Sequence, residues 1–280
     1  MNKLYLILIS LGLFQVANAV NTSNVVASGV TTSVSSVKTS SLQEFTIDSD
    51  EELSVQLLDN CWNNRENLAN QKIIADYLMT KPKIPNNYEI AWKVARLVYF
   101  IGNYGIGEKN YVNTEDGVKL FDYGVSAGKI AMEAMPRKVE GYYWYAIDLG
   151  SYGLANGILS SASNAKDGMA ALATVEKIDS SYQWNGSSRI LGRYYEELPG
   201  IFGGDTKKAY SYLSKAVRKS SNFRNNWVFL GQYYISQGEY AKAINACKVA
   251  VNLQDQDGKF EEMRYSREAR ECIAKAKSKQ

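Results

Sequence analysis

Apolar side chains recur three or four positions apart along most of the chain beyond residue 50, with polar residues between them. This spacing places the apolar residues on one face of a helix. Short stretches rich in Gly, Pro and Asn separate the periodic segments, and residues 150–156 are predicted to form a glycine-containing turn. The helices predicted in this way cover residues 49–65, 68–79, 88–99, 114–134, 139–149, 165–178 and 260–277, with two further pairs between 185 and 256.

The most regular segment lies between residues 227 and 250 and fits the pattern W-x-x-L-G-x-x-Y followed by two alanines. Its residues are Trp227, Leu230, Gly231, Tyr234, Ala243 and Ala250. This spacing resembles the tetratricopeptide repeat, in which small residues stand where two helix backbones approach closely. One helix pair cannot bury its apolar face alone, so such pairs stack on one another. The resemblance therefore predicts an all-α fold, a tetratricopeptide-type α-solenoid.

The predicted solenoid fills residues 45–280 and has about four helix pairs with capping helices at both ends. The repeats are expected at residues 86–137, 138–180, 185–220 and 224–256, and the C-terminal cap at 260–277. The third repeat has Gly192 and Tyr195 on its first helix. It also has five more residues in its turn than the fourth repeat, and Asp205 is the expected N-cap of the helix that follows.

The N-terminus has the features of a secretion signal in residues 1–19: Lys3, an apolar stretch over residues 4–16, and Ala17-Asn18-Ala19 as cleavage site. A membrane anchor is the alternative, but the apolar stretch is shorter than the roughly 20 residues that span a bilayer. Residues 20–44 are rich in Ser and Thr and are expected to form a flexible leader, or else an edge strand. Localisation in the periplasm of a Gram-negative-type bacterium follows from the signal.

Charge and composition exclude several classes of function. The 32 basic and 29 acidic residues are nearly balanced, so no nucleic-acid partner is indicated. The sequence has no His, which excludes Ser-His-Asp and Cys-His catalysis. No metal site, cofactor or enzymatic activity is expected. Cys61 is the third cysteine beside Cys247 and Cys272; a bridge between the latter two and buried free thiols both remain open.

The long turn of the third repeat resembles a more specific family. Residues 198–205 read Leu-Pro-Gly-Ile-Phe-Gly-Gly-Asp and precede Lys207, Lys208 and Ala209. Together with residues 88–92 and 142–146, this turn is similar to TatT, the tetratricopeptide family that accompanies some periplasmic TRAP transporters. The resemblance implies an exported homo-trimer with an apolar channel or pocket that works beside a substrate-binding protein. The chain lacks the lipobox Cys, and related turns occur in the regulator-of-microtubule-dynamics family.

Aromatic residues with a polar tip are the candidates for ligand binding, since the first helices of stacked repeats line a concave surface. The candidates are Trp92, Tyr99, Tyr143, Trp144 and Tyr152. The alternative is that they belong to the core between repeats. Ile201 and Phe202 in the long turn are expected either to contact a partner or to fold back onto the repeat. Its glycines, Gly200, Gly203 and Gly204, are expected to adopt positive φ.

These features favour a binding and scaffolding protein for a small apolar or amphipathic ligand or a periplasmic protein partner. The alternative is a protein–protein adaptor in envelope assembly or secretion without a small ligand. An adaptor predicts a groove lined by polar residues such as Asn and Lys that clamps an extended peptide. The two hypotheses differ in what lines the concave surface.

Overall fold

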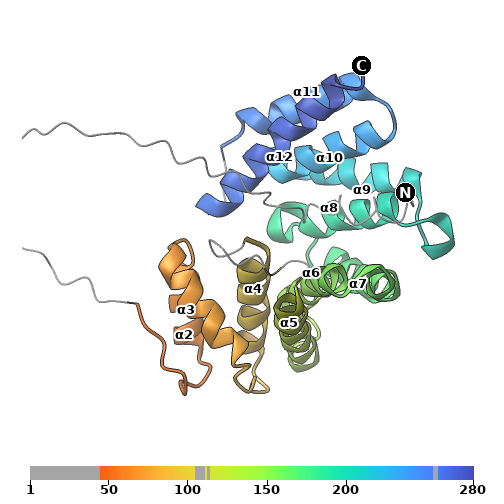
Figure 1. Ribbon diagram of the computed structural model, residues 1–280. Coiled ribbons are helices and arrows are strands. Elements are labelled where there is room, and N and C mark those ends of the chain that lie inside the picture. Colours follow the sequence, from red (N-terminus) through yellow and green to blue (C-terminus); the bar gives the residue numbers. More distant parts are fainter. Residues whose placement is uncertain (1–44, 105–110, 112–113, 255–257) are drawn as a thin grey trace, which may run out of the picture.

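The computed structural model describes residues 45–104, 111, 114–254 and 258–280 of the chain (Figure 1). All regular structure in these residues is helical, with eleven α-helices and one 3-10 turn. The helices are α2 (Val55–Asn64), α3 (Leu68–Met79), α4 (Tyr88–Tyr104), α5 (Glu115–Ala134), α6 (Val139–Asn156), α7 (Ile158–Ile178), α8 (Tyr182–Glu197), η1 (Gly200–Phe202), α9 (Thr206–Lys219), α10 (Arg224–Ser236), α11 (Tyr240–Asn252) and α12 (Lys259–Lys277). The predicted signal peptide and leader lie outside the described residues.

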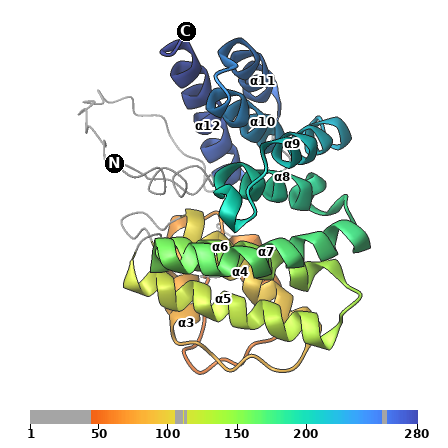
Figure 2. The same cartoon turned by 90° about the vertical axis from the view of Figure 1, so that its right-hand side faces the viewer.

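The helices pack as consecutive pairs: α4 with α5, α6 with α7, α8 with α9, and α10 with α11. Helices α2 and α3 cover α4 at one end, and α12 packs on α10 and α11 at the other (Figures 1 and 2). This arrangement confirms the predicted all-α solenoid. None of the described helices is long and apolar enough to cross a membrane.

Side chains at the helix N-termini fix where several helices begin. Thr114 caps α5 by accepting the Gly117 amide, and Asp205 caps α9 by accepting the amides of Lys207 and Lys208 at 3.0 Å each. The predicted cap at Asp205 is therefore confirmed. The predicted start of the first helix near residue 49 is wrong. Ser54 accepts the Leu57 amide at 3.1 Å and so places the start of α2 at Val55, beyond the acidic run.

The glycine-containing turn predicted for residues 150–156 is not present. Helix α6 continues to Asn156, and Gly157 ends it with φ of 98°. Gly150 lies inside the helix, where an added Cβ would come within 3.3 Å of the Tyr194 hydroxyl oxygen. Close packing against α8 thus explains the glycine, and tertiary contacts override its low helix propensity. Helix α7 begins at Ile158 and not, as predicted, at Ala165.

The regular repeat packs as its spacing predicts. Leu230, Ala243 and Ala250 are buried. A Cβ added to Gly231 would lie 2.2 Å from the Cys247 Sγ atom, so the glycine permits the close approach of α10 and α11. In the same way a Cβ on Gly192 would lie 2.6 Å from the Leu213 Cγ atom.

The other two positions of the motif are aromatic and partly buried. The Trp227 indole donates to the Ser221 carbonyl at 2.7 Å, and Tyr234 packs against both C-terminal core clusters. The Tyr195 ring stacks on Tyr212 at 5.6 Å between centroids. These residues therefore hold the pairs together.

Cys247 and Cys272 form a disulfide between α11 and α12, with 6.2 Å between their Cα atoms. The bridge attaches the last helix to the fourth helix pair. Cys61 is a buried free thiol, and burial raises its pKa to about 12.

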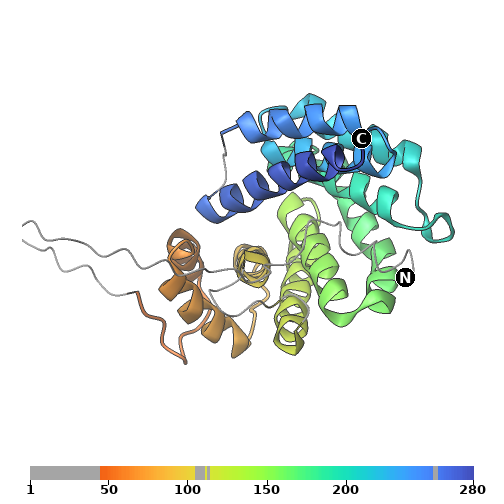
Figure 3. The same ribbon diagram turned by 45° about the horizontal axis from the view of Figure 1, so that its top comes forward.

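The C-terminal helix returns to the N-terminal helices and closes the solenoid into a ring. The Lys259 amide donates to Glu66 Oε1 at 2.9 Å. The Phe260 and Phe100 rings meet edge to face at 6.5 Å, and the Tyr265 and Tyr104 hydroxyls are 2.8 Å apart. Figures 1 and 3 show the first turns of α12 directed toward α2–α4. Helix α12 thereby covers part of the concave face.

Candidate binding cavity

A cavity of about 380 Å³ lies at the centre of this ring. Its walls come from α4, α6, α8 and α10, the first helix of each pair, together with the C-terminal end of α2 and the start of α12. The inward position of the first helices is the one that stacked helix pairs predict. The closing helix α12 turns an open concave surface into a pocket.

Aromatic rings form much of the wall. The Tyr99 and Trp144 rings of α4 and α6 are 5.8 Å apart, and Tyr143 meets Trp144 edge to face at 5.1 Å. Phe100 stacks on Tyr104 at 5.1 Å. Because aromatic pairs prefer such geometries, the wall is packed before any ligand enters.

Three of the five candidate aromatic residues line this cavity, namely Tyr99, Tyr143 and Trp144. Trp92 and Tyr152 do not. The Trp92 ring lies 4.8 Å from the Arg96 guanidinium, and its indole donates to Glu89 at 3.0 Å. The Tyr152 hydroxyl accepts from Asn156 at 3.2 Å on the same helix. Whether the three lining residues contact a ligand stays a prediction.

The sequence interpretation missed the arginines of the cavity. The described lining includes Arg65, Arg96, Arg189, Arg193 and Arg264, and it includes the acidic residue Glu261. A signal was present, because Arg96 stands within the periodic α4 pattern and Arg189 and Arg193 are one turn apart on α8. A charged residue at such a position indicates either an ion pair in the core or a site.

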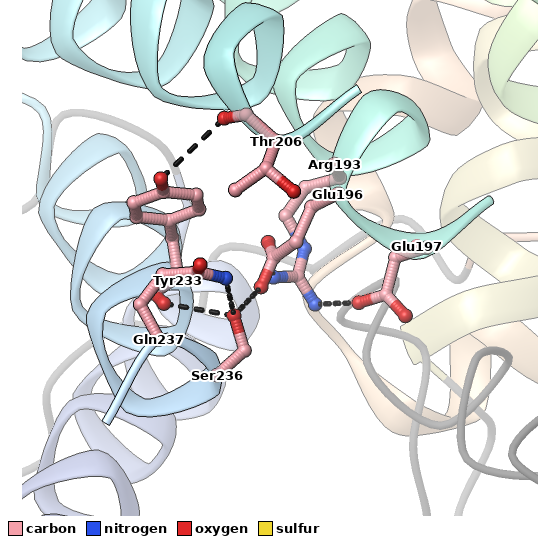
Figure 4. Close-up of polar contacts among 7 residues, drawn as sticks. All are labelled: Arg193, Glu196, Glu197, Thr206, Tyr233, Ser236 and Gln237. Atoms are coloured by element: carbon pink, nitrogen blue, oxygen red, sulfur yellow. Dashed lines mark hydrogen bonds and ion pairs between the residues drawn. The ribbon is translucent and has the colours of Figure 1, made fainter. Parts of the chain in front are cut away.

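Arg193 is the most buried of these arginines, at 1% exposure, and it forms an ion pair with two adjacent carboxylates (Figure 4). Its guanidinium binds Glu196 and Glu197 together, since they lie three and four positions further along α8. Ser236 of α10 donates to Glu196 at 2.7 Å and accepts from Gln237 at 3.1 Å.

Burial raises the pKa of Glu197 to about 7, against the opposing effect of Arg193. Because Ser236 of α10 donates to Glu196, the ion pairs of Arg193 with Glu196 and Glu197 form a network that joins α8 to α10. Nearby, the Tyr233 hydroxyl donates to the Thr206 carbonyl at 3.4 Å and ties α10 to α9 (Figure 4).

A left-handed turn borders the cavity at the start of α8. Gln183, Trp184 and Asn185 have φ of 51°, 52° and 58°, although none is a glycine. Each such residue costs roughly 1–2 kcal/mol. Two contacts stabilise the turn. Asn226 donates a hydrogen bond to the Trp184 carbonyl at 3.1 Å, and the Trp184 ring stacks on Phe223 with 4.7 Å between centroids. Strained backbone of this kind concentrates at functional sites.

The residues of the long turn lie away from the cavity. Ile201 is 87% exposed and Phe202 49% exposed on η1, so neither folds back onto the repeat. Of the three glycines, Gly203 alone has positive φ, at 95°. The prediction is wrong for Gly200 and Gly204. Gly204 instead allows a close backbone approach, because a Cβ there would lie 1.6 Å from the Leu198 carbonyl oxygen.

The cavity presents aromatic rings and guanidinium groups. Among the residues that the structure describes, no three His, Cys, Asp or Glu side chains are placed to hold a metal ion. Aromatic faces and guanidinium groups offer stacking and charge-assisted hydrogen bonds.

Comparison with solved structures identifies the architecture. No family model matches the sequence, and no curated protein matches it. The structure is similar to TTC0263, a thermophilic TPR protein from Thermus thermophilus. The TM-score is 0.51 at 16% identity, over 76% of this chain and 96% of that chain. The fold is a tetratricopeptide-type α-solenoid.

Two structures of MamA also match, each with a TM-score of 0.38. Their identities are 21% and 19%, over 57% and 67% of this chain and 89% and 92% of theirs. Scores and identities this low add no argument about function. The resemblance to TatT stays a prediction.

Proposed function

We propose that this tetratricopeptide solenoid is an exported binding protein that holds a small amphipathic ligand in its central cavity. The observation that supports the proposal is the partly open cavity of about 380 Å³ at the centre of the ring. Typical small-molecule sites have about 300–1,000 Å³ and combine apolar walls with a few polar groups. The aromatic wall and the guanidinium groups provide both.

The transport role rests on the sequence. A signal peptide in residues 1–19 and the TatT-like turn favour an accessory component of a TRAP-type system in the periplasm. In that setting the protein works beside a substrate-binding protein. A trimer is part of the same proposal.

A protein–protein adaptor is the second candidate, and the exposed turn favours it. Ile201 and Phe202 present an apolar tip to solvent, and such tips are typical of partner contacts. The cavity itself argues for the ligand, because its described lining has no lysine and only one asparagine, Asn225. An adaptor groove for an extended peptide would have more of these polar groups.

Native mass spectrometry on the purified protein tests the ligand hypothesis. Small molecules should co-purify, remain bound under gentle conditions and be released on denaturation. Ile147 lines the cavity, so Ile147→Trp should fill part of it and abolish co-purification. Ile178→Trp makes the same change at an exposed position on α7 and should have no effect.

Two results would contradict the ligand hypothesis. The wild-type protein would carry no small molecule, or Ile147→Trp would retain as much as the wild type does. A bare monomer would favour the adaptor, for which substitution of Phe202 should then abolish capture of envelope proteins.

A further inference from the structure

Arg96 differs from the other lining arginines in making no hydrogen bond or ion pair within the described part of the chain. Its guanidinium carbon lies 3.9 Å from the centre of the Trp62 ring and 4.8 Å from that of Trp92. Its Nε atom is inaccessible to solvent and makes no hydrogen bond there. The aromatic faces stabilise the cation but leave its buried Nε–H donor unsatisfied.

The other four arginines are engaged. Arg193 binds Glu196 and Glu197, and Arg264 binds Glu268 at 2.8 Å. Arg189 donates to Asn226 Oδ1 at 2.9 Å. Arg65 lies 3.5 Å from Glu66 and also donates to the Trp62 carbonyl. Four of the five lining arginines thus have hydrogen-bond or ion-pair partners within the protein and need no ligand to satisfy them.

The remaining cation is costly in free energy. Arg96 is half-buried, and Asp59, the carboxylate that acts on its charge, is itself paired with Lys93. Removing a cation from water is destabilising unless hydrogen bonds satisfy it. Burial lowers the pKa of Arg96 to about 10, against the opposing effects of Tyr182 and Asp59 and with a smaller contribution from Arg65, so the group stays protonated at neutral pH. Glu261 is the acidic residue of the lining and lies at the start of α12. It packs beside Gly258, since a Cβ added to Gly258 would be 2.8 Å from the Glu261 Oε2 atom.

We propose that the cavity binds a small organic anion with a planar apolar body, and that the Arg96 guanidinium holds its carboxylate or other oxyanion. The anion supplies the acceptors that Arg96 lacks, and a guanidinium fork binds such groups in two parallel hydrogen bonds. The planar body lies among the rings of Tyr99, Phe100 and Trp144. This inference rests on the proposed small-ligand function and names the class of its ligand.

Two fluorescent probes that differ in one charged group test the proposal. 8-Anilinonaphthalene-1-sulfonate has a sulfonate, and N-phenyl-1-naphthylamine has the same rings without it. The purified wild-type protein should bind the sulfonate at least about tenfold more tightly, which corresponds to one charge-assisted contact. A series of aromatic carboxylates should displace it, and their neutral amides should not.

Substitutions then assign the effect to one side chain. Arg96→Met should weaken the sulfonate at least about tenfold and change the affinity of the neutral probe less than about twofold. Arg267→Met is the matched control on the exposed face of α12, where Arg267 lies 3.6 Å from Glu271, and it should change neither affinity. Arg96→Lys keeps the charge and should retain part of the preference. Ile147→Trp should weaken both probes, which locates them in the cavity.

Each failure has its own meaning. If neither probe binds the wild-type protein, both the proposed function and this inference are wrong. If the two probes bind equally well, or Arg96→Met weakens both alike, the ligand site stands and the role of Arg96 is refuted. Circular dichroism checks the fold of each variant. If Arg96→Met does not fold, the ratio of the two probe affinities for the wild type and for Arg96→Lys still decides.

Discussion

Asp148 is the buried group whose replacement gives the sharpest prediction. It lies on α6 with no exposed surface, and neither carboxyl oxygen has a hydrogen-bond partner among the described residues. The carboxyl group occupies the space left by Gly124 of α5, where an added Cβ would be 2.4 Å from its Oδ2 atom. Burial raises its pKa well above the usual 3.8. Between pH 3.8 and this raised pKa, Asp148 therefore stays protonated in the native state and ionises in the unfolded chain.

The consequence is a pH-dependent loss of stability. Above the unfolded pKa of 3.8 and below the raised native value, the native state binds one more proton than the unfolded state. The free energy of unfolding then falls by about 1.4 kcal/mol for each unit of pH. Below the unfolded value both states hold the proton and the effect vanishes. Asp148→Asn has nearly the same shape and cannot ionise, so it should remove this slope.

The assay is urea unfolding of the wild type and Asp148→Asn at intervals from about pH 3 to pH 8. The two proteins should have similar stability at the acid end, and the variant should gain about 1.4 kcal/mol per pH unit above it, until the native group ionises. Asp167→Asn on the exposed face of α7 controls for the change in net charge. Parallel pH profiles for the wild type and Asp148→Asn would refute the reasoning.

Three further predictions concern stability. Replacing Cys272 by Ser should lower the free energy of unfolding by about 3.5 kcal/mol, because the bridge to Cys247 spans 25 residues; reduction of the wild type should give the same loss in urea melts. Glu197→Gln should remove a fall in stability as pH rises from 4.5 to about 7, since burial raises the native pKa over that interval; an unchanged pH profile would contradict this. Gln183→Gly should raise the free energy of unfolding by about 0.5–1 kcal/mol, because glycine adopts the left-handed φ of 51° without strain. A lower free energy of unfolding in the same melts would show that contacts of the Gln183 side chain outweigh the backbone strain.

The sequence predicts several helices from local signals. The Asp205 cap and the apolar period of residues 88–99 suffice for α9 and most of α4. The predicted turn at residues 150–156 fails because Gly150 is explained by a contact with Tyr194, more than 40 residues away. Local propensity cannot show such a contact.

The same distinction applies to the cavity. Tyr99, Tyr143 and Trp144 could be chosen from the sequence because the first helices of stacked pairs face inward. The proposed role of Arg96 could not be predicted in this way, because it depends on which groups surround the guanidinium in the folded structure. They include Trp62 of α2, whose position over Arg96 depends on how α2 packs against α4.

The closure of the ring by α12 changes how the protein assembles. In an open array of repeats each unit contacts only its neighbours, so the ends fray and folding can begin anywhere. Here the Lys259 amide is bound to Glu66 across 193 positions of the chain. The closing segment is the last part of the chain to become available for folding, so the cavity can form only when nearly the whole chain is present. A product truncated before α12 would then fold as a curved array and leave its inner face open.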